Sequence, residues 1–476
     1  MLIKAALVAG VQRDIRCHDG FISAIADDLR PVADERVIQA HGGSLIPGLH
    51  DHHMHFFATA ALQRSVDCGS REVLSPSGKS VSTNHDTRSL RRLFNELPAD
   101  GWLRGVNYHE SIAGNLDGLQ LDKLVSDRPA RIQHRSGKVW ILNSLAMAAL
   151  DLTAQKNLPG VELDGQGQPT GRLFRLDAWL REQLGQQDPI DVSVLSRQMA
   201  SYGITGFTDT SATNSQATVT QFELMCARGE ILQNAHLMGD DSLSPSSGSG
   251  FGHLKILLDE DNLPSLADLE VRIRAAREKG RGIAFHCVSH VETLFAIAAL
   301  DACEDIDAQK DFADRIEHGS MIFDDVLPML QKLNLSVVTQ PGFLLHRGDQ
   351  YQQNLTAHEL AHLYRYRTLL DAGIKVGLSS DAPYGPLNPW QVMHCAVSRQ
   401  TIAGDVIGAA DCVTPEQALA GYLSHANDPG GVGRDVAVGE RADLCLLKSP
   451  WGDVRQRLGT TEVAYTVISG KVVYAC

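Results

Sequence analysis

The stretch with the clearest capacity for chemistry is 47–55, Pro-Gly-Leu-His-Asp-His-His-Met-His, which holds four histidines and one aspartate within six consecutive positions. It follows a short apolar run that is typical of a strand. Side chains two positions apart on a strand point to the same face, so we expect Asp51, His53 and His55 to form one row. Two neighbouring imidazoles at a strand end can bind one divalent metal. The alternative, an inert and exposed histidine cluster, is disfavoured by the Pro-Gly-x-x-Asp lead-in and by polar residues downstream.

Further residues of metal-binding type stand at or near the ends of later predicted strands. They are Lys255, His286, His318 and Asp381. Lys255 lies in the apolar run Leu-Lys-Ile-Leu-Leu-Asp on the fourth predicted strand, where burial of a lysine is costly unless it is paired or modified. Two alternatives stay open at this strand: the lysine faces solvent, or Asp259 at its end is the acid that matters. Together these residues would make a site for one or two divalent metal ions.

The elements that must position these residues are apolar β-like runs that alternate with helical stretches. The predicted strands are 46–50, 130–134, 204–209, 254–258, 283–287, 314–317, 336–340 and 374–379. This alternation favours an α/β fold, a (β/α)8 TIM-type barrel, in which all C-terminal strand ends open onto one mouth. An open doubly wound sheet is the alternative, but no Gly-x-Gly-x-x-Gly follows an early strand.

Both ends of the chain show short β patterns. They cover 3–8, 21–26 and 36–39 at one end and 442–447, 463–468 and 472–474 at the other. We expect residues 1–46 and 428–476 to form one small β-sandwich domain and residues 47–427 to form the barrel domain. Two independent β tails would leave unpaired sheet edges.

Composition narrows the class of protein further. The chain has 476 residues, 43% of them hydrophobic, and a net charge of −14, which argues against a nucleic-acid or anionic-membrane partner. Nine cysteines without a Cys-x-x-Cys pair are typical of free thiols in a reducing compartment. The N-terminus lacks the pattern of a signal peptide, and no stretch is apolar enough to span a membrane. We therefore expect a soluble, cytoplasmic protein.

The order Pro47-Gly48-x-x-Asp51-x-His53-x-His55, His286, His318 and Ser380-Asp381 resembles that of the amidohydrolase superfamily. The run 203–209 (Gly-Ile-Thr-Gly-Phe-Thr-Asp) and the tail 439–444 (Gly-Glu-Arg-Ala-Asp-Leu) resemble its amidohydrolase-3 branch, which includes the N-substituted formamide deformylases. The resemblance covers essentially the whole chain. It implies a metal-dependent hydrolase with a (β/α)8 barrel and a small β-sandwich from both ends.

The resemblance also implies roles for the polar residues. His53, His55 and Asp381 would bind a first metal, and His286 and His318 a second. Lys255 would carry a carboxylate on its amine and bridge the two metals, which would remove the cost of burying a cation. The histidine-rich set favours zinc as the metal.

One position departs from the branch pattern. In the run 135–144, Arg-Ser-Gly-Lys-Val-Trp-Ile-Leu-Asn-Ser, Lys138 stands where relatives usually carry a histidine thought to face the substrate. Transfer of a relative's substrate to this chain is therefore not justified. A solvated surface lysine is the alternative interpretation of Lys138.

We expect the reaction to be hydrolysis of a non-peptide C–N bond, of amide type, in a small molecule. A water activated by the metal would attack, and Asp381 would act as the catalytic base and proton shuttle. The predicted substrate-binding residues are Tyr108, His109, Lys138, Gln340, His346 and Tyr351. Alternatives are deamination, opening of a cyclic amide or ester hydrolysis by the same site, and a metal-binding protein without catalysis. The sequence is compatible with a homo-oligomer.

Overall fold

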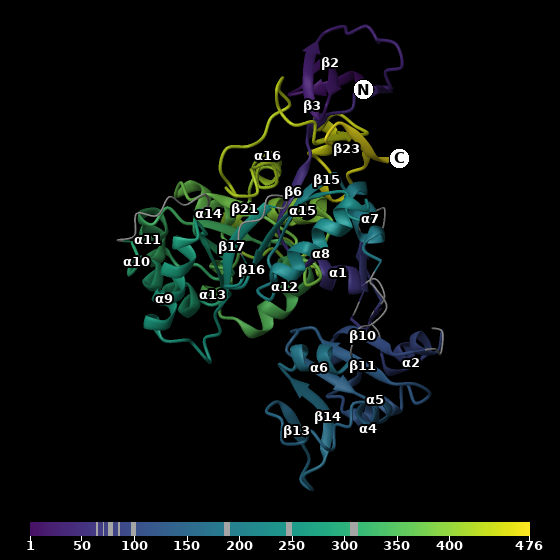
Figure 1. The fold of residues 1–476 in the computed structure, drawn as a ribbon, viewed down its shortest axis with the longest axis vertical. Coiled ribbons are helices and arrows are strands. Elements are labelled where there is room, and N and C mark those ends of the chain that lie inside the picture. Colours follow the sequence, from purple (N-terminus) through teal and green to yellow (C-terminus); the bar gives the residue numbers. More distant parts are fainter. Residues whose placement is uncertain are drawn as a thin grey trace. The chain divides into compact units, whose positions relative to one another are not determined.

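The computed structural model describes residues 1–62, 65–69, 71–74, 80–83, 86–96, 101–184, 191–243, 250–304 and 313–476. The chain divides into two compact units, which Figure 1 draws with the elements labelled. The first unit combines Met1–Phe56 with Val192–Cys476, and the second is Phe57–Asp191.

The first unit contains an eight-stranded parallel sheet in the order β21-β20-β19-β18-β17-β16-β15-β6. Its strands are β6 (Leu49–Met54), β15 (Ile204–Asp209), β16 (Asn234–Gly239), β17 (Gly250–Leu257), β18 (Ile283–Cys287), β19 (Arg315–His318), β20 (Ser336–Thr339) and β21 (Val376–Leu378). The two outer strands are adjacent, because a backbone N–H just after β21 donates to a β6 carbonyl: Asp381 N lies 2.8 Å from His53 O. The sheet therefore curls into the expected (β/α)8 barrel.

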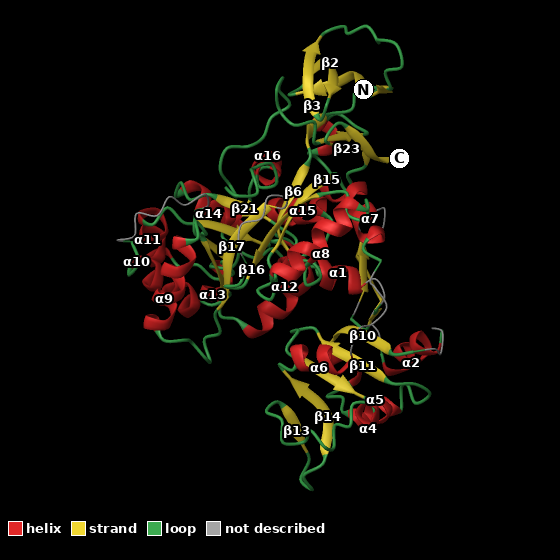
Figure 2. Ribbon diagram, viewed as in Figure 1, coloured by secondary structure: helices red, strands yellow, loops and turns green. Residues whose placement is uncertain are grey.

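The strand sequences suit a sheet that is covered on both faces. All residues of β6, β15, β19, β20 and β21 are buried, as expected for parallel strands flanked by helices. Figure 2 shows helices packed around these strands. The helices of this unit are α7 (Ser193–Ser201), α8 (Gln216–Ala227), α9 (Leu266–Glu278), α10 (His290–Asp301), α11 (Leu327–Lys332), α12 (Gly342–Asn354), α13 (Ala357–Ala361), α14 (Tyr366–Asp371), α15 (Pro389–Ser398), α16 (Pro415–Ala420) and α17 (Trp451–Val454), with 3₁₀ turns η1 (Asp324–Val326), η2 (Ala409–Asp411) and η3 (Leu458–Thr460). Helix α1 (Phe56–Leu62) belongs to the second unit except for its first residue.

Both chain ends build a β-sandwich, as predicted. One sheet has the order β3-β2-β1-β4 and the other β24-β23-β22-β5. Their strands are β1 (Leu2–Val8), β2 (Val11–His18), β3 (Phe21–Ala26), β4 (Val37–Gln39), β5 (Leu45–Pro47), β22 (Leu444–Leu447), β23 (Val463–Ile468) and β24 (Lys471–Ala475). Ile3 and Ile15 share one buried core with Leu444 and Val467, so the two ends fold as one layered structure.

The second unit has its own sheet, in the order β13-β14-β12-β11-β10-β7, and a two-stranded sheet, β8-β9. Its strands are β7 (Val66–Asp67), β8 (Arg71–Leu74), β9 (Ser80–Thr83), β10 (Leu103–Tyr108), β11 (Ala130–His134), β12 (Val139–Leu142), β13 (Val161–Leu163) and β14 (Pro169–Phe174), and its helices are α2 (Thr87–Asn95), α3 (Glu110–Ala113), α4 (Gly118–Asp122), α5 (Ser144–Ala149) and α6 (Asp177–Leu184). Two buried clusters, one around Phe94 and Ile132 and one around Trp140 and Leu173, form its core.

One predicted barrel strand belongs elsewhere. Residues 130–134 do form a strand, but it is β11 of the second unit. The barrel strand missing from the prediction is β16, whose sequence Asn-Ala-His-Leu-Met-Gly is not a continuous apolar run. The two errors cancel in the count, so Lys255 still lies on the fourth barrel strand. The predicted domain limits of 1–46 with 428–476 and 47–427 stay a prediction.

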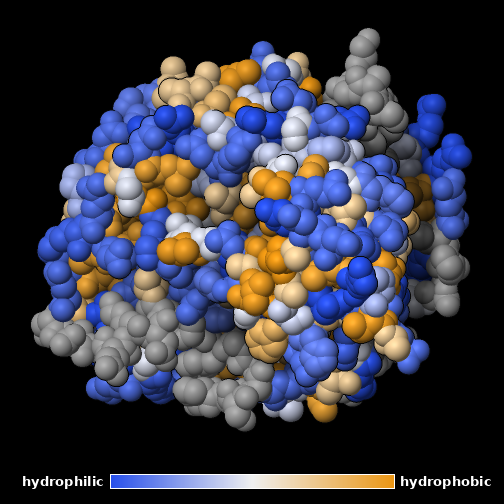
Figure 3. Space-filling view, turned by 90° about the horizontal axis from the view of Figure 1, so that it is seen from above, coloured by the Kyte–Doolittle hydropathy of each residue, from blue (hydrophilic) through white to orange (hydrophobic). Residues whose placement is uncertain are grey.

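The face of the protein drawn in Figure 3 is mixed in polarity. The face in Figure 3 is covered largely by hydrophilic residues with scattered apolar groups between them. Among the described residues, no helix combines the length and the apolar character needed to cross a membrane.

Candidate metal centre

Strand β6 presents the histidine-rich stretch at the mouth of the barrel. Gly48, just before it, has no space for a side chain, because a Cβ there would lie 2.1 Å from Cγ2 of Thr205 on β15. This close approach packs the first two barrel strands together. His53 is fully buried, and His55, just beyond the strand end, keeps about a quarter of its side chain exposed.

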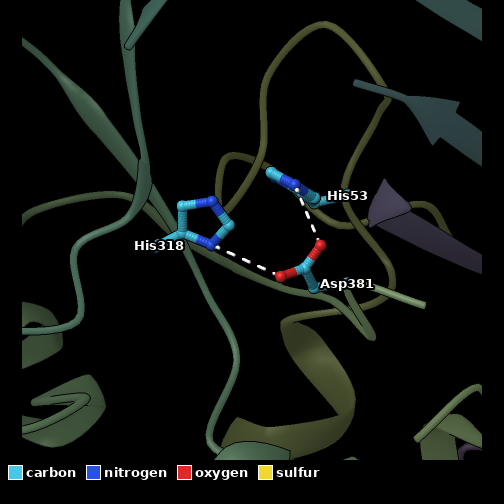
Figure 4. A group of neighbouring side chains, drawn as sticks. All are labelled: His53, His318 and Asp381. Atoms are coloured by element: carbon cyan, nitrogen blue, oxygen red, sulfur yellow. Dashed lines mark ion pairs between the residues drawn. The ribbon is translucent and has the colours of Figure 1, made fainter. Parts of the chain in front are cut away.

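Asp381 completes a cluster with these histidines. Its Oδ1 lies 3.4 Å from Nε2 of His53 and 3.5 Å from Nε2 of His55, and its Oδ2 lies 3.7 Å from Nδ1 of His318. Figure 4 shows the carboxylate between the rings of His53 and His318. Donor atoms of His53, His318 and Asp381 all lie within 4.8 Å of one another. His318 is predicted to bind a second metal, but in the structure it also lies close to His53 and Asp381, two of the residues predicted to bind the first metal.

The distances within this cluster fit a divalent cation. Ligand atoms that share a tetrahedral zinc ion at about 2.0–2.2 Å lie roughly 3.2–3.6 Å apart. Both contacts of Asp381 Oδ1, to His53 and to His55, fall in that range. His53 Nε2 and Asp381 Oδ1 are buried and have no hydrogen-bond partner among the described residues. Buried polar atoms are rarely left without a partner, so this donor pair fits a bound metal.

The charges around His53 and Asp381 also favour a positive charge between these two side chains. Burial lowers the pKa of His53, but the carboxylates of Glu317 and Asp381 more than offset it and raise that pKa. Burial raises the pKa of Asp381, yet its contacts with His53, His318 and His55 bring it below its ordinary value. Asp381 is therefore a carboxylate at neutral pH.

His286, one residue before the end of β18, and His318, the last residue of the neighbouring β19, contact each other. Nε2 of His318 lies 2.8 Å from Nδ1 of His286. Burial, with Lys255 as the next cause, lowers the pKa of His286 to about 3. Burial also lowers the pKa of His318, so both rings are neutral, the form in which histidine binds metals. His318 has a left-handed backbone with φ of 70°, as does Asp381 with φ of 50°; such conformations are uncommon and concentrate at functional sites.

Lys255 is buried rather than solvent-facing. Only 3% of the residue is exposed, and its Nζ has no hydrogen-bond partner among the residues that the structure describes. Burial lowers its pKa to about 8, although Glu317 and Asp381 favour the charged form. An amine with this pKa is partly neutral near pH 7, as carboxylation by CO₂ requires. The geometry is consistent with the predicted carboxylated lysine, while half-buried Asp259 lies beyond the end of β17.

Two charged residues behind the cluster were missed by sequence reasoning. Glu317, fully buried on β19, accepts a hydrogen bond from Nδ1 of His53. Arg315, also fully buried, pairs with Glu317 and donates from Nη2 to the carbonyl oxygen of His52 at 2.7 Å. Burial raises the pKa of Glu317, but Arg315, Lys255 and His53 lower it well below its ordinary value. The available signal was a buried strand, Arg-Ile-Glu-His, with charges two positions apart on one face.

The hydrogen bonds of Asp51 give the aspartate of the Pro-Gly-x-x-Asp motif a structural role. Its Oδ1 accepts backbone N–H groups of His53 at 3.2 Å and of Ser380 at 3.1 Å. Burial raises its pKa to about 6 despite these hydrogen bonds. Asp51 therefore ties the strand that carries the histidines to the segment that carries Asp381.

The predicted substrate-binding residues of the barrel differ in their surroundings. Gln340 is buried, and its Oε1 lies 3.0 Å from Nδ1 of His318 while its Nε2 donates to the hydroxyl of Ser379 at 3.0 Å. Its amide is thus engaged in orienting His318. On α12, Tyr351 shares a hydrogen bond with the hydroxyl of Tyr364 at 3.0 Å, and His346 is exposed. Their contacts with substrate stay predictions.

The other three predicted substrate residues belong to the second unit. Tyr108 is buried, and its hydroxyl donates to the carbonyl oxygen of Gly114 at 2.5 Å. His109 is the N-cap residue of α3, and Lys138 is exposed in the turn between β11 and β12. Substrate contact by these residues is likewise a prediction.

A parallel (β/α)8 barrel with histidines and an aspartate at the carboxyl ends of its strands defines a class of barrel enzymes with a metal-type centre at the mouth. Within that class, the chain belongs to the amidohydrolase family: the amidohydrolase-3 family model matches residues 36–474.

Two curated relatives agree with this assignment. The N-substituted formamide deformylase of Arthrobacter pascens is 25% identical over 93% of this chain and 90% of its own length. The putative amidohydrolase YtcJ of Bacillus subtilis (strain 168) is 23% identical over 92% of this chain and 90% of its own length.

Solved structures agree on the fold. An uncharacterized metal-dependent hydrolase from Pyrococcus horikoshii superposes with a TM-score of 0.73 at 15% identity, covering 99% of this chain and 98% of that chain. N-isopropylammelide isopropylaminohydrolase from Burkholderia multivorans superposes with a TM-score of 0.53 at 14% identity, covering 100% and 98%. The 5-methylcytosine deaminase from Klebsiella pneumoniae gives a TM-score of 0.55 at 13% identity, with the same coverage.

Proposed function

We propose that this protein is a metal-dependent hydrolase that cleaves a non-peptide C–N bond, of amide type, in a small molecule. The observation that carries the proposal is the approach of Asp381 Oδ1 to His53 and His55 at 3.4 and 3.5 Å, together with the burial of His53 Nε2 and Asp381 Oδ1, which have no hydrogen-bond partner among the described residues. The family and the deformylase relative support the bond type. We propose residues 47–427 as the hydrolase domain, with the second unit inserted in it.

Each side chain of the centre has a distinct part in the reaction. His53, His55 and Asp381 would hold one divalent ion, and His286 and His318 the other; zinc fits this donor set. A bound ion would supply Lewis acidity and lower the pKa of a coordinated water to about 7. Asp381, a carboxylate at neutral pH, accepts the proton of the attacking water at Oδ2 and passes it to the leaving nitrogen.

Lys255 would link the two halves of the centre. A carboxylated amine is an anion with two oxygens, which suits a position close to Glu317 and Asp381 only when cations lie between them. Carboxylation and metal binding should therefore depend on each other. The cost of a buried ammonium disappears once the amine carries the carboxylate.

The test of the function is a substrate panel with product identification. Purified, zinc-loaded protein is incubated with N-acyl amines, N-substituted formamides, cyclic amides, aminopyrimidines and small esters. We expect release of a substituted amine together with a carboxylic acid. Metal-dependent release of ammonia alone would favour deamination, and ring opening without fragmentation would favour cyclic-amide hydrolysis.

A matched variant separates catalysis from metal binding. Asp381→Asn should retain metal and lose amine release, whereas a binding protein without catalysis would show no turnover in either form. Failure of the zinc-loaded wild-type protein to turn over any member of the panel would contradict the proposed bond type.

A further inference from the structure

A second cluster of metal-binding side chains lies in the unit 57–191, at the carboxyl ends of β10 and β11. Oε2 of Glu110 lies 3.3 Å from Nε2 of His109 and 3.3 Å from Nε2 of His134. All three donor atoms lie within 4.8 Å of one another. The backbone fixes this arrangement, because Tyr108 and His134 are register partners of the parallel strands and Arg135 N–H donates to the carbonyl oxygen of Tyr108 at 2.8 Å.

The cluster has the dimensions of a metal site. The distances from Oε2 of Glu110 to the two histidine Nε2 atoms are both 3.3 Å. They fall within the roughly 3.2–3.6 Å expected between ligand atoms of one tetrahedral zinc ion. Two histidines and one glutamate form a donor set that zinc accepts with a fourth position open. The side chains of His109 and His134 are 25% and 17% exposed, so an ion can reach the cluster from solvent.

The same local sequence orients both rings. His109 and His134 are each followed two positions later by a serine, Ser111 and Ser136. Nδ1 of His109 lies 2.9 Å from Oγ of Ser111, and Nδ1 of His134 lies 2.8 Å from Oγ of Ser136. The backbone N–H of each serine also donates to that Nδ1, at 3.2 and 3.1 Å. Both Nε2 atoms are thereby turned toward Glu110.

These contacts specify where the ring protons go. A backbone N–H that donates to Nδ1 places the proton of a neutral ring on Nε2, facing the Glu110 carboxylate. Binding of a cation at Nε2 would require this proton to move to Nδ1, where the serine Oγ would accept it and the hydrogen bond from the serine backbone N–H would be lost. A histidine whose second nitrogen donates to an oxygen is the usual arrangement of a metal ligand.

The charge states suit a cation. Burial raises the pKa of Glu110, but a hydrogen bond from its own backbone and the histidines more than offset it, so the side chain is a carboxylate at neutral pH. Burial, with Arg135 as the next cause, lowers the pKa of His109 and favours the neutral ring.

We propose that His109, Glu110 and His134 form a further divalent-metal site that takes zinc or a similar ion with one coordination position left for an exogenous ligand. The site goes beyond the proposed hydrolase centre and uses none of its residues. It gives His109 the role of a metal ligand in place of the direct substrate contact predicted from the sequence.

An H-E-x-x-H sequence elsewhere provides a control. His358-Glu359-Leu360-Ala361-His362 has the spacing of a metalloprotease motif. Glu359 instead lies in the first turn of α13 as part of a capping box, accepting the backbone N–H and the hydroxyl of the N-cap residue Thr356 at 2.8 Å each. No third histidine, cysteine or carboxylate joins this pair in the described part of the chain.

The test counts zinc ions on the full-length protein. Protein already loaded at the barrel centre is titrated with Zn²⁺ in competition with a chromophoric chelator. The wild-type protein should bind one equivalent more than His134→Asn or Glu110→Gln. Ser111→Ala should keep that equivalent but bind it roughly 10–100-fold more weakly, because the serine only orients a ligand.

The double variant His358→Asn/His362→Asn should bind as the wild type does. Unchanged circular dichroism and barrel metal content show that a variant is folded. If folded His134→Asn and Glu110→Gln both bind the same number of zinc ions as the wild type, with the same affinity, the proposed site is wrong. Loss of the extra equivalent only in the His358/His362 variant would also overturn it.

Discussion

The backbone N–H of Asp381 donates a hydrogen bond to the carbonyl oxygen of His53, with 2.8 Å between the nitrogen and oxygen atoms. This bond joins the segment after the last barrel strand to the first strand. Asp51 adds a second tie, because one carboxylate oxygen accepts backbone N–H groups from both segments. Two proposed ligands far apart in the sequence are thus held together by backbone contacts and not by their side chains alone.

The first prediction concerns Asp381 as the proton acceptor. Asp381→Asn keeps the size of the side chain and an oxygen that can coordinate weakly, but the amide cannot take a proton from water. Turnover per bound metal should fall on the order of 10²–10⁴-fold, the usual scale of general acid–base catalysis. His318→Asn should instead lower metal content and turnover together. Near wild-type turnover per metal in Asp381→Asn would leave Asp381 as a ligand only.

The second prediction concerns Glu317, which holds Nδ1 of His53. Glu317→Gln removes the charge behind this ligand, so metal affinity should fall roughly 10–100-fold in chelator competition. It also leaves the buried Arg315 guanidinium without its anion, and breaking such a pair costs about 3–5 kcal/mol. The variant should therefore also unfold at lower temperature.

A matched control separates these two effects. Asp314 and Arg277 form another buried ion pair in the same unit, at 2.9 Å. Asp314→Asn should lower stability without changing metal affinity. Equal losses of metal affinity in Glu317→Gln and Asp314→Asn would show that Glu317 acts through stability alone.

The contact between Glu317 and His53 also shows where sequence reasoning stops. The barrel and the positions of the candidate ligands near strand ends could be predicted, because strand alternation and strand-end position are local patterns. The pairing of two residues 264 positions apart could not, since it depends on which strands become neighbours. Strand β16 was missed for a related reason: its polar start, Asn-Ala-His, lacks a strand pattern, and burial in the barrel decides its conformation.

The third prediction distinguishes two roles for Gln340. The sequence predicts substrate contact, whereas its amide oxygen lies 3.0 Å from Nδ1 of His318. Gln340→Leu removes this acceptor and leaves the ring proton of a buried histidine unpaired, a cost of about 1–3 kcal/mol. We expect kcat and metal affinity to fall while KM stays within about twofold. A large rise in KM with unchanged kcat would support substrate contact instead.

The fourth prediction uses the pKa of Lys255, which burial lowers to about 8. Only the neutral amine reacts with CO₂, and its fraction rises with pH until the pH exceeds this pKa. At a fixed concentration of dissolved CO₂, the rate of activation of metal-free protein by CO₂ and zinc should therefore fall about tenfold per pH unit well below pH 8 and level off above it. Isotopically labelled bicarbonate and NMR should reveal a carbamate carbon that Lys255→Arg lacks. The same carbamate signal in Lys255→Arg would exclude this lysine.

Metal removal and return test the central claim most directly. The protein is stripped by a chelator and titrated with Zn²⁺, while amine release from the best N-acyl amine of the panel and bound zinc are measured in the same samples. Amine release should be absent from stripped protein, rise in proportion to zinc bound at the barrel centre, and stay near zero in His53→Asn at every zinc concentration. Full amine release by stripped protein, or equal release by His53→Asn, would contradict a metal-dependent hydrolase at this centre.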